Sequence, residues 1–520
     1  MNAALLLEHY AQIADAPDAI ARMRRFILDL AVRGKLVEQD TNDEPASETL
    51  GAVGIAECDA AAGVPGWAEA KVGKLLAFQY GKGLPANDRL DNGPIPVFGS
   101  NGIVGGTHTA LTDRPAVIVG RKGSAGALNL CDGPSWTTDV AYFVEAPSFF
   151  LIQYLMLALA ALNLDQLGKG VKPGLSRSDA YALDLCVPPL AEQHRIVAKF
   201  DELMALCDQL ETAQAERETG RDKLTLSTLA KLNEPDPEAF DDDTRFALEH
   251  LEPLTKRTDQ IKQLRQTILN LAVRGKLVEQ NPADEPASEL LKQIAVQKAK
   301  LGIKERHSPI ALDETPFELP RSWVWSRIGG ICTKTGSGST PRGGKDVYKT
   351  SGVPFLRSQN VYNDGLRLND VAFIEPSTHA RMISTAVMGG DLLLNITGGS
   401  MGRCCRIPDD FAEANVSQHV AIIRPAVAGM VDFLHCLILS PYFQAFIFDE
   451  QTGAGRGGLP KNRMDKIIVA LPPLVEQHRI VAKVSELMAL CDQLEASLVE
   501  GEQTRSKLLA AVLHEALEPA

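Results

Sequence analysis

The sequence predicts a mixed α/β protein in which two α/β domains are joined by long antiparallel coiled-coil helices, with an internal pseudo-twofold repeat. Three observations lead to this fold class. The chain has 520 residues, more than one hydrophobic core usually organises. Two blocks of its sequence occur twice, and both carry apolar residues at helical spacing. Two dissimilar inserts lie between the blocks, and each combines strand-like with helix-like segments.

The first repeated sequence, block A, opens each half of the chain. LAVRGKLVEQ at Leu30–Gln39 recurs letter for letter at Leu271–Gln280, and DEPASE at Asp43–Glu48 recurs at Asp284–Glu289. Both matches are offset by 241 residues. Such exact recurrence indicates an internal duplication.

The second repeated sequence, block B, closes each half. PPLAEQHRIVAK at Pro188–Lys199 returns as PPLVEQHRIVAK at Pro472–Lys483, and ELMALCDQLE at Glu202–Glu211 returns unchanged at Glu486–Glu495. This offset is 284, so the segment between the blocks is 43 residues longer in the second half. Duplication alone would explain the identical blocks. Because the inserts have diverged almost beyond recognition, we interpret the blocks as one frame that presents two different ligand-binding inserts.

Both blocks predict helices, because their apolar residues recur three and four positions apart. Block A is expected to end its helix at Gly34 and at Gly275. The block B helix should begin near Glu192 or Glu476, and the first copy should run to about Lys231, a length of roughly 60 Å. The predicted apolar stripes are Ile20, Met23, Ile27 and Leu30, with Ile261, Leu264, Ile268 and Leu271, for block A, and Val197, Phe200, Met204 and Cys207, with Val481, Val484, Met488 and Cys491, for block B.

Each insert predicts short strands, one apolar helix and a glycine-rich basic loop before its last strand. For the first insert these are strands at Ile95–Phe98, Ala116–Gly120 and Val140–Val144, a helix at Phe149–Leu164 and a loop at Gly168–Arg177. For the second they are strands at Val353–Leu356, Asp391–Thr397 and Val420–Arg424, a helix around Val431–Phe448 and a loop at Gly453–Arg463. The same order of elements predicts that the two inserts share a fold.

Charge is distributed unevenly along the chain, whose formal net charge is −13. Trp67–Val187 holds 10 Lys and Arg against 10 Asp and Glu, whereas Pro320–Leu471 holds 16 against 12. The acidity therefore lies in the predicted helices and in an acidic, proline-containing linker at Asn233–Asp243. A net acidic chain is unusual for a nucleic-acid-binding protein, but its inserts are neutral or mildly basic.

We expect five segments. They are an N-terminal frame helix at 1–50, a first insert domain at 51–189, central repeated helices with the acidic linker at 190–299, a second insert domain at 300–473, and a C-terminal repeated helix at 474–520.

The beginning of the chain, Met1–Leu5, lacks the basic and apolar pattern of a signal peptide, and no apolar run approaches the ~18 residues needed to span a bilayer. We therefore expect a cytoplasmic protein. The nine cysteines include no C-x-x-C pair, so we expect reduced thiols rather than disulfides or a zinc site.

No catalytic motif is recognisable. Gly336–Asp346 resembles a phosphate-binding loop, but its glycines have the wrong spacing and Asp346 follows Lys345 where Ser or Thr is required. Neither an amino-methyltransferase tetrapeptide nor a nuclease carboxylate motif occurs. His194 and His478 recur within the frame and favour a structural or partner-contact role over acid–base chemistry. The histidines lack metal-ligand spacing, and we expect no metal.

DNA recognition is the function that remains. Positive side chains beside glycines suit phosphate contacts, while Arg, Asn, Gln and Ser can distinguish base edges. The candidates in the first insert are Ser100, Asn101, Arg121, Lys122, Lys169, Lys172 and Arg177. The candidates in the second are Arg342, Lys345, Arg357, Gln359, Asn360, Arg403, Arg456, Lys461 and Arg463.

The layout closely resembles the specificity subunits of type I restriction-modification enzymes over nearly the whole chain. The resemblance rests first on the paired PPLxEQHRIV and AVRGKLV sequences of the frame. Within the inserts, Val97–Ile103 with Gly120–Gly126 is similar to one type of target-recognition domain, and Gly338–Pro341 with Gly390–Leu394 is similar to another.

This resemblance implies a non-catalytic subunit with two target-recognition domains, each binding one half of a split double-stranded DNA target. It implies two modification (methyltransferase) subunits and restriction (motor-nuclease) subunits as partners, and no membrane. S-adenosylmethionine, ATP and Mg²⁺ would belong to those partners, with no cofactor in this chain. The complete block A before the first insert departs from the family, where this segment is often short, and leaves the pairing of frame helices open.

Three alternatives stay open. The chain could serve a methylation-only or other phage-defence assembly without a restriction subunit, because that distinction lies in the partners. It could be a methyltransferase of unrecognised type, which would bind S-adenosylmethionine by itself. It could also be a scaffold whose inserts bind proteins, in which case exchanging the inserts would not change any DNA sequence preference.

Overall fold

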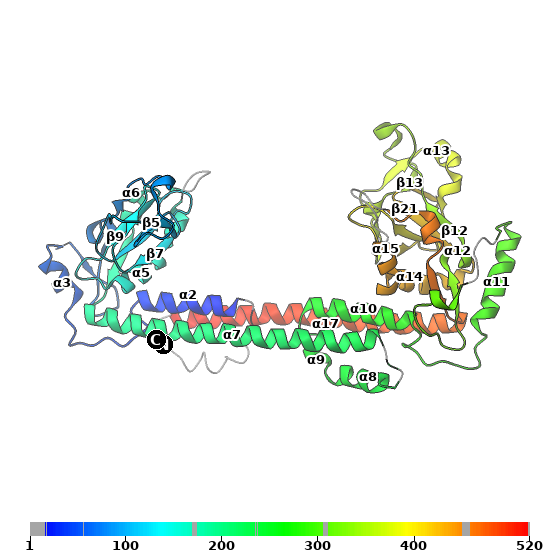
Figure 1. The fold of residues 1–520 in the computed structure, drawn as a ribbon, viewed down its shortest axis with the longest axis horizontal. Helices are drawn as coiled ribbons and strands as arrows, with labels where there is room; N and C mark the ends of the chain where they lie inside the picture. The colour runs from blue at the N-terminus through cyan, green and yellow to red at the C-terminus, as the bar shows by residue number, and fades with distance from the viewer. Residues whose placement is uncertain are drawn as a thin grey trace. The chain divides into compact units, whose positions relative to one another are not determined.

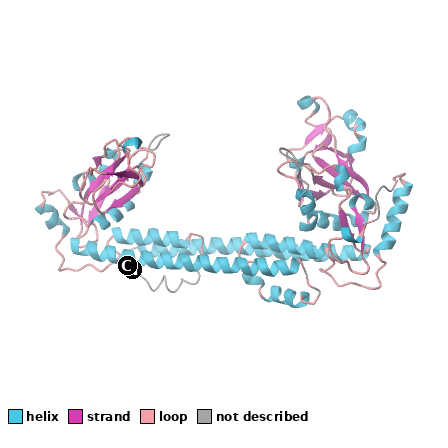
Figure 2. Cartoon of the chain, in the orientation of Figure 1, coloured by secondary structure: helices cyan, strands magenta, loops and turns pink. Residues whose placement is uncertain are grey.

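The computed structural model describes residues 16, 18–55, 57–168, 174–234, 236, 238–304, 310–449 and 458–517. The chain forms two compact units. Unit 1 comprises Met1–Glu218 with Gly501–Ala520, and unit 2 comprises Thr219–Glu500. Strands lie in the two insert regions and long helices in the frame, as Figures 1 and 2 show.

Unit 1 contains the first insert between α2 (Ala19–Val32) and α7 (Leu190–Asn233). The elements between them are α3 (Ala46–Ala52), β1 (Asp59–Ala60), β2 (Ala68–Lys71), α4 (Val72–Leu75), β3 (Gln79–Tyr80), β4 (Ile95–Phe98), β5 (Ile103–Thr107), β6 (Ala116–Gly120), β7 (Leu128–Cys131), β8 (Trp136–Thr137), β9 (Ala141–Glu145), α5 (Ile152–Ala161), α6 (Arg177–Tyr181) and β10 (Asp184–Val187).

Unit 2 contains the second insert between α10 (Thr258–Val273) and α17 (Leu474–Leu517). Its other elements are α8 (Phe240–Glu249), α9 (Leu251–Leu254), α11 (Ala287–Lys300), β11 (Val324–Arg327), α12 (Ile328–Ile331), β12 (Cys332–Ser337), β13 (Val353–Leu356), β14 (Val361–Tyr362), β15 (Gly365–Leu366), β16 (Ala372–Ile374), α13 (Pro376–Arg381), β17 (Ala386–Val387), β18 (Leu392–Asn395), β19 (Cys404–Arg406), β20 (Ala414–Val416), β21 (Val420–Pro425), α14 (Val431–Leu439), α15 (Pro441–Asp449), α16 (Lys461–Met464) and β22 (Ile468–Leu471).

The two inserts have closely similar sheets, although one sheet has three strands in the first insert, β5-β4-β8, and four in the second, β16-β13-β20-β17. One four-stranded sheet has the order β3-β9-β6-β7 in the first insert and β12-β21-β18-β19 in the second. A second sheet contains one parallel pair in each insert, β4 with β8 and β13 with β20. The expectation of a shared fold is therefore confirmed. Additions such as the β14–β15 hairpin and the longer α11 help to account for the greater length of the second half.

The entry and exit of each insert are adjacent. Strand β2 enters the first insert and pairs antiparallel with β10, which leaves it, so that Ala68 faces Val187. Strand β11 pairs in the same way with β22 in the second insert, where Val324 faces Leu471. The chain thus enters and leaves each insert through one antiparallel strand pair, which β1 extends to three strands in the first insert.

Both frame helices α7 and α17 are 44 residues long. They begin two residues before the predicted starts at Glu192 and Glu476. Unit 1 contains the N-terminal part of α7 and the C-terminal part of α17, and unit 2 contains the converse parts, as an antiparallel arrangement requires. The predicted seam is found, because Cys207 and Cys491 are buried and the apolar residues preceding them pack against the same cores.

The repeated frame motif is explained by contacts that recur in both copies. In unit 1, Trp67 Nε1 donates to Glu192 Oε2 at 2.9 Å and Gln39 Nε2 donates to Glu192 Oε1 at 3.1 Å. Arg195 pairs with Asp43 at 2.6 Å. Each of these residues lies in a repeated block except Trp67, which stands at the start of the insert.

Unit 2 repeats this set of contacts with one difference. Trp323 Nε1 and Gln280 Nε2 both donate to the same oxygen, Glu476 Oε1, at 3.0 and 2.6 Å. Glu476 Oε2 is buried without a hydrogen-bond partner among the described residues. Arg479 pairs with Asp284 at 2.6 Å, which matches the pair in unit 1.

Two predicted segments need correction. The acidic linker at Asn233–Asp243 is not wholly a linker, because α8 begins at Phe240; the carboxylates of Asp241, Asp242 and Asp243 favour the N-terminus of a helix. The single helix expected around Val431–Phe448 is two helices, α14 and α15, since Pro441 cannot donate the backbone hydrogen bond needed to continue α14.

The helix predicted at Phe149–Leu164 is shorter, at Ile152–Ala161. The buried side chain of Gln193 accepts a hydrogen bond from Leu151 N at 2.8 Å and donates one to Phe149 O at 2.8 Å. These contacts hold the preceding residues in a turn, in which Phe150 N donates to Pro147 O at 2.9 Å, instead of in the helix. Among the described residues no single helix is long and apolar enough to cross a bilayer, although the bent pair Ala428–Leu439 and Pro441–Phe448 meets that test by length and composition.

Candidate nucleic-acid interface

An exposed aromatic ring lies between two arginines at the end of the four-stranded sheet of the first insert. Tyr80, the last residue of β3, is 50% exposed. The guanidinium carbon of Arg121 lies 4.9 Å from the centre of its ring and that of Arg177 lies 5.0 Å from it. Tyr142 packs beside the ring with its centroid 5.1 Å away. Cation–π attraction therefore orients both arginines.

The turn between β6 and β7 brings further predicted residues to this end of the sheet. A side chain at Gly120 would collide with the carbonyl oxygens of Ser124 and Ser100, so only glycine permits this close approach. Lys122 is exposed, and its backbone pairs with Gly174 just before α6. Ser100, Arg121, Lys122 and Arg177 thus come from separate segments to one surface.

Asn101 is exposed and follows Ser100 directly. Lys169 and Lys172 lie outside the described residues. Tyr80 and Lys82 were not among the residues predicted from the sequence. Lys82 is exposed, and its backbone carbonyl accepts a hydrogen bond from Trp136 Nε1 at 2.9 Å. The only local signal was the Gly81-Lys82-Gly83 tripeptide, because a two-residue strand has no detectable period.

The strand registers identify the equivalent positions in the second insert. Tyr80 faces Tyr142 across the sheet, as Ser337 faces Ala421. Gly120 faces Ala141, as Asn395 faces Val420. Ser337 therefore takes the position of Tyr80.

The glycine-rich turns correspond in the same way. Leu175 N donates to Arg121 O at 2.9 Å, and Leu459 N donates to Ile396 O at 2.9 Å. Arg177 and Lys461 are the first residues of α6 and α16. The second insert therefore replaces Tyr80, Arg121 and Arg177 by Ser337, Ile396 and Lys461.

Lys461 is already neutralised within the second insert. Its Nζ lies 2.7 Å from Asp465 Oδ2 and donates to Thr335 Oγ1 at 2.6 Å. The neighbouring Arg463 is half-buried on the same short helix α16. This corner of the second insert is therefore less positive than its counterpart in the first.

The second insert has a different aromatic–arginine group. The guanidinium carbon of Arg403 lies 4.7 Å from the ring centre of Tyr362, and that of Arg367 lies 5.1 Å from it. Tyr362 belongs to the β14–β15 hairpin, which has no counterpart in the described first insert. Arg367 and Tyr362 were not among the predicted residues, because the two hairpin strands have only two residues each.

Arg357 and Gln359 converge on a single acidic residue. Arg357 Nη2 donates to Asp370 O at 3.0 Å, and Gln359 Nε2 donates to Asp370 Oδ2 at 2.6 Å. Asn360 is 1% exposed, and its amide bonds the backbone of Arg357 and Arg367. The Asn360 side chain therefore stabilises its own turn, and it is not available at the surface.

Arg342 lines a polar cavity of about 620 Å³ together with Lys349 and Arg381. Asp346 and Glu375 line the same cavity, and Lys349 lies 3.5 Å from Glu375. Lys345 belongs to the 3-10 turn Gly344–Val347, but its side chain is not described, and Arg456 lies outside the described residues. The cavity mixes charges of both signs.

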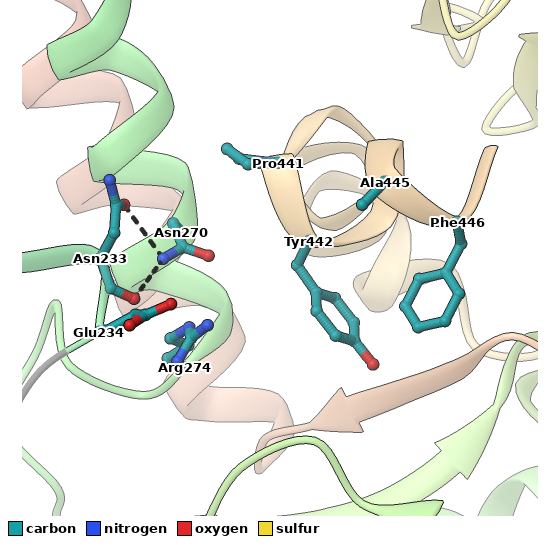
Figure 3. A pocket seen from close by; sticks show the side chains of 8 residues that line it. All are labelled: Asn233, Glu234, Asn270, Arg274, Pro441, Tyr442, Ala445 and Phe446. Atoms are coloured by element: carbon teal, nitrogen blue, oxygen red, sulfur yellow. Dashed lines mark hydrogen bonds between the residues drawn. The ribbon is translucent and has the colours of Figure 1, made fainter. Parts of the chain in front are cut away.

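Figure 3 shows a second cavity, of about 470 Å³, between the frame helices and α15 in unit 2. Asn270 Nδ2 donates to Asn233 O at 3.0 Å and to its Oδ1 at 3.1 Å. Burial lowers the pKa of Arg274, against the opposing effect of the Glu234 carboxylate beside it. This cavity contains none of the predicted DNA contacts.

The described residues contain no group of three or more His, Cys, Asp or Glu side chains that could hold a metal ion. All nine cysteines are free thiols, and burial raises the pKa of Cys332 and Cys405 to about 12. His194 and His478 are exposed, and His478 Nε2 lies 3.2 Å from Gly429 O. These thiols and imidazoles lack the arrangement of a nucleophile with its base.

Comparison with known proteins agrees with this architecture. A model of the type I restriction modification DNA specificity domain matches residues 65–218 and 320–500, once in each half. The EcoEI specificity subunit of Escherichia coli is 27% identical over 578 residues, covering 96% of this chain and 94% of that protein. The EcoAI specificity subunit of Escherichia coli is 27% identical over 572 residues with the same coverage.

Among solved structures, the HsdS subunit from Thermoanaerobacter tengcongensis aligns with 15% identity and a TM-score of 0.44, over 87% of this chain and 96% of that one. The S subunit of M. genitalium aligns with 15% identity and a TM-score of 0.29, over 92% and 98%. The family match by itself covers more than half of the chain and includes both copies of block B. The chain belongs to the type I restriction-modification DNA specificity family, as a non-catalytic subunit that recognises DNA sequence.

Proposed function

We propose that this chain recognises a DNA target of two separated half-sites, one contacted by each insert, in a complex with methyltransferase and restriction subunits. The observation that carries the proposal is that the two inserts have different side chains at equivalent positions of a shared fold. Tyr80, Arg121 and Arg177 in the first insert correspond to Ser337, Ile396 and Lys461 in the second. One fold with different side chains at the same surface suits two different base sequences.

In this proposal the target-recognition domains are residues 51–189 and 300–473. The frame consists of residues 1–50, 190–299 and 474–520, and it sets the spacer between the half-sites. The proposed contacts are the predicted residues of the glycine-rich turns and loops, together with the two aromatic–arginine groups. Asn360 is left out, because its amide is used internally.

Exchange of the first insert tests this function. The chain is expressed in a host with its modification subunit, either intact or with residues 51–189 replaced by the insert of another specificity subunit, and methylated sites are mapped across the genome. We expect a split motif of which only one half changes. Absence of a motif, or a change of both halves together, would contradict the proposal.

The charge of the chain indicates that partners supply much of its affinity for DNA. The formal net charge is −13, whereas nonspecific DNA affinity comes mainly from cationic contacts with phosphates. We expect the isolated chain to bind DNA weakly and in a salt-sensitive manner, and the assembled complex to bind tightly and specifically. Equal affinity and specificity in both states, measured by fluorescence anisotropy, would refute this part of the proposal.

The frame carries a surface suited to two copies of one partner. Seven residues are exposed in both copies of block B and identical between them, although they need not be retained for internal packing. Two of them are Leu206, with Leu490, and Asp208, with Asp492; the aspartates pair with Arg24 and Arg265 of the frame. The other five lie on one face of each frame helix, at His194, Ala198, Glu202, Ala205 and Gln209 and at His478, Ala482, Glu486, Ala489 and Gln493. We assign this face, the repeated stripe, to two modification subunits.

Stoichiometry tests the repeated stripe. Ala205→Glu should leave one modification subunit bound, and Ala205→Glu with Ala489→Glu should leave none, as counted by native mass spectrometry. Asp201→Ser is the matched control, because Asp201 is exposed on the same helix and Ser485 occupies its position in the second copy. Two bound subunits in the double variant would exclude this surface.

A further inference from the structure

We propose that Arg121 and Arg177, oriented by the ring of Tyr80, recognise guanine in the half-site contacted by the first insert. This inference rests on the proposed function and assigns base-specific roles within it. Arg121 and Arg177 would touch the base edges, and Tyr80 would act as a positioning residue. The Tyr80 ring is exposed, and neither arginine has a carboxylate partner among the described residues.

The Tyr80 side chain is not buried in the core of the insert. Half of its surface is exposed at the end of β3, although the neighbouring Phe78 and Tyr142 are buried. One side of the ring packs against Tyr142, with 59° between the planes. Its remaining contacts include the two guanidinium groups, which stand 4.9 and 5.0 Å from the ring centre.

Neither arginine has a carboxylate partner among the residues that the structure describes. Arginines of the frame differ in this respect, since Arg195 and Arg479 each pair with an aspartate at 2.6 Å. Arg121 and Arg177 share one aromatic ring, so two positive charges are held near each other without neutralisation. A negatively polarised ligand would relieve their mutual repulsion.

The arginines retain donors for such a ligand. Arg121 Nη1 donates to Asp139 O at 3.0 Å, and Arg177 Nη1 contacts Phe78 O at 3.5 Å. A guanidinium has five N–H donors in one plane, and hydrogen bonds to described residues occupy one of them in each arginine. Guanine presents O6 and N7 side by side in the major groove, and a planar guanidinium can donate to both at once.

Tyr80 makes a base contact more suitable than a phosphate contact. A phosphate can be bound by the flexible ammonium group of a lysine as well as by a bidentate arginine, whereas simultaneous donation to O6 and N7 of guanine needs donors held in the plane of the base. Stacking on the ring provides that orientation and limits the side-chain entropy lost on binding. The second insert has no arginines stacked on a ring at the equivalent position, because Ser337 has no ring and Lys461 is paired with Asp465.

Genome-wide methylation mapping of the complex with its modification subunit tests the inference. Tyr80→Ala and Arg121→Lys should each relax one G·C position of the first half-site, lowering discrimination on the order of 10- to 100-fold, while the other half-site stays unchanged. Tyr80→Phe keeps the ring and should preserve the motif. Arg114→Gln is the control within the same insert, because Arg114 is an exposed arginine paired with Glu145 at 3.3 Å.

The outcomes separate the inference from the function on which it rests. A split wild-type motif whose first half has no G·C pair would overturn the inference. Uniformly lower methylation in Arg121→Lys without a change of sequence would also overturn it, because that result indicates a phosphate contact. Thermal unfolding shows whether Tyr80→Ala is destabilised. If it is, the methylation motif of Arg121→Lys alone tests the inference. Absence of any split motif in the wild-type complex would instead contradict the proposed function.

Discussion

The two halves of the chain share side-chain contacts in the frame, but in the inserts they share mainly the order of strands. In the frame, residues of the same type make nearly the same contacts, including the pairs Arg195–Asp43 and Arg479–Asp284. In the inserts only the strand order recurs, and the surface position of Tyr80 is taken by Ser337. Identity was retained where side chains of the frame contact each other and the start of each insert. Variation is found where the proposed DNA surface lies.

The largest effects are expected in the insert cores, where the two halves should respond alike. Ile118 in β6 and Leu393 in β18 are equivalent by register and fully buried. We expect Ile118→Ala and Leu393→Ala each to lower the free energy of unfolding by about 2–5 kcal/mol, from lost burial and a residual cavity.

Each core substitution should destabilise only its own unit. Hydrogen exchange resolved by peptide should show faster exchange in unit 1 for Ile118→Ala and in unit 2 for Leu393→Ala. Equal acceleration throughout both units in either variant would show that the inserts do not unfold separately.

A smaller effect should distinguish the two frame connections. Trp67→Phe removes the donor to Glu192 Oε2, and that buried oxygen then lacks a hydrogen bond, at a cost of about 1–3 kcal/mol. Trp323→Phe should cost less, because Glu476 Oε1 keeps the bond from Gln280. Urea unfolding of both variants measures the difference. An equal or larger loss of stability for Trp323→Phe would contradict the prediction that the remaining hydrogen bond from Gln280 satisfies Glu476 Oε1.

The smallest effect concerns pH, and here the two halves should agree. Burial raises the pKa of Glu192 and of Glu476 above the ordinary value of 4.5. Because the native state favours the protonated form of each, their contribution to stability is complete below the unfolded-state pKa and is lost as pH rises through the raised pKa. Glu192→Gln and Glu476→Gln should each remove part of this decrease. Urea unfolding midpoints of the two variants are measured from pH ~4 to pH ~7. If they fall as steeply as those of the wild type, Glu192 and Glu476 are not the source of the pH dependence.

Much of the fold could be predicted from the sequence. The repeat located the frame, and the strands at Ile95–Phe98, Ala116–Gly120 and Val353–Leu356 have the predicted bounds. These strands are apolar and bounded by turn residues, so local pattern and tertiary burial agree. The break between α14 and α15 also had a sequence signal, Pro441 itself. The continuous apolar pattern around it nevertheless led to the prediction of a single helix.

The candidate site was only partly predictable. Arg121 and Arg177 were identified as basic residues beside glycines, but their common partner Tyr80 lies on a two-residue strand. Contacts between segments so far apart in sequence depend on sheet register, which no local pattern specifies. Asn360 shows the opposite error, since its residue type suits base recognition while its burial gives it a role in a turn.

The pairing of β2 with β10, and of β11 with β22, has a consequence for how such a protein changes over generations. Each insert enters and leaves the frame through neighbouring strands, directly beside the hydrogen bond from Trp67 to Glu192 or from Trp323 to Glu476. Recombination at these two points would exchange a whole insert without altering the contacts of the frame. Under the proposed function, such an exchange would give a new half-specificity in one genetic event and leave unchanged the frame that the partner subunits would contact.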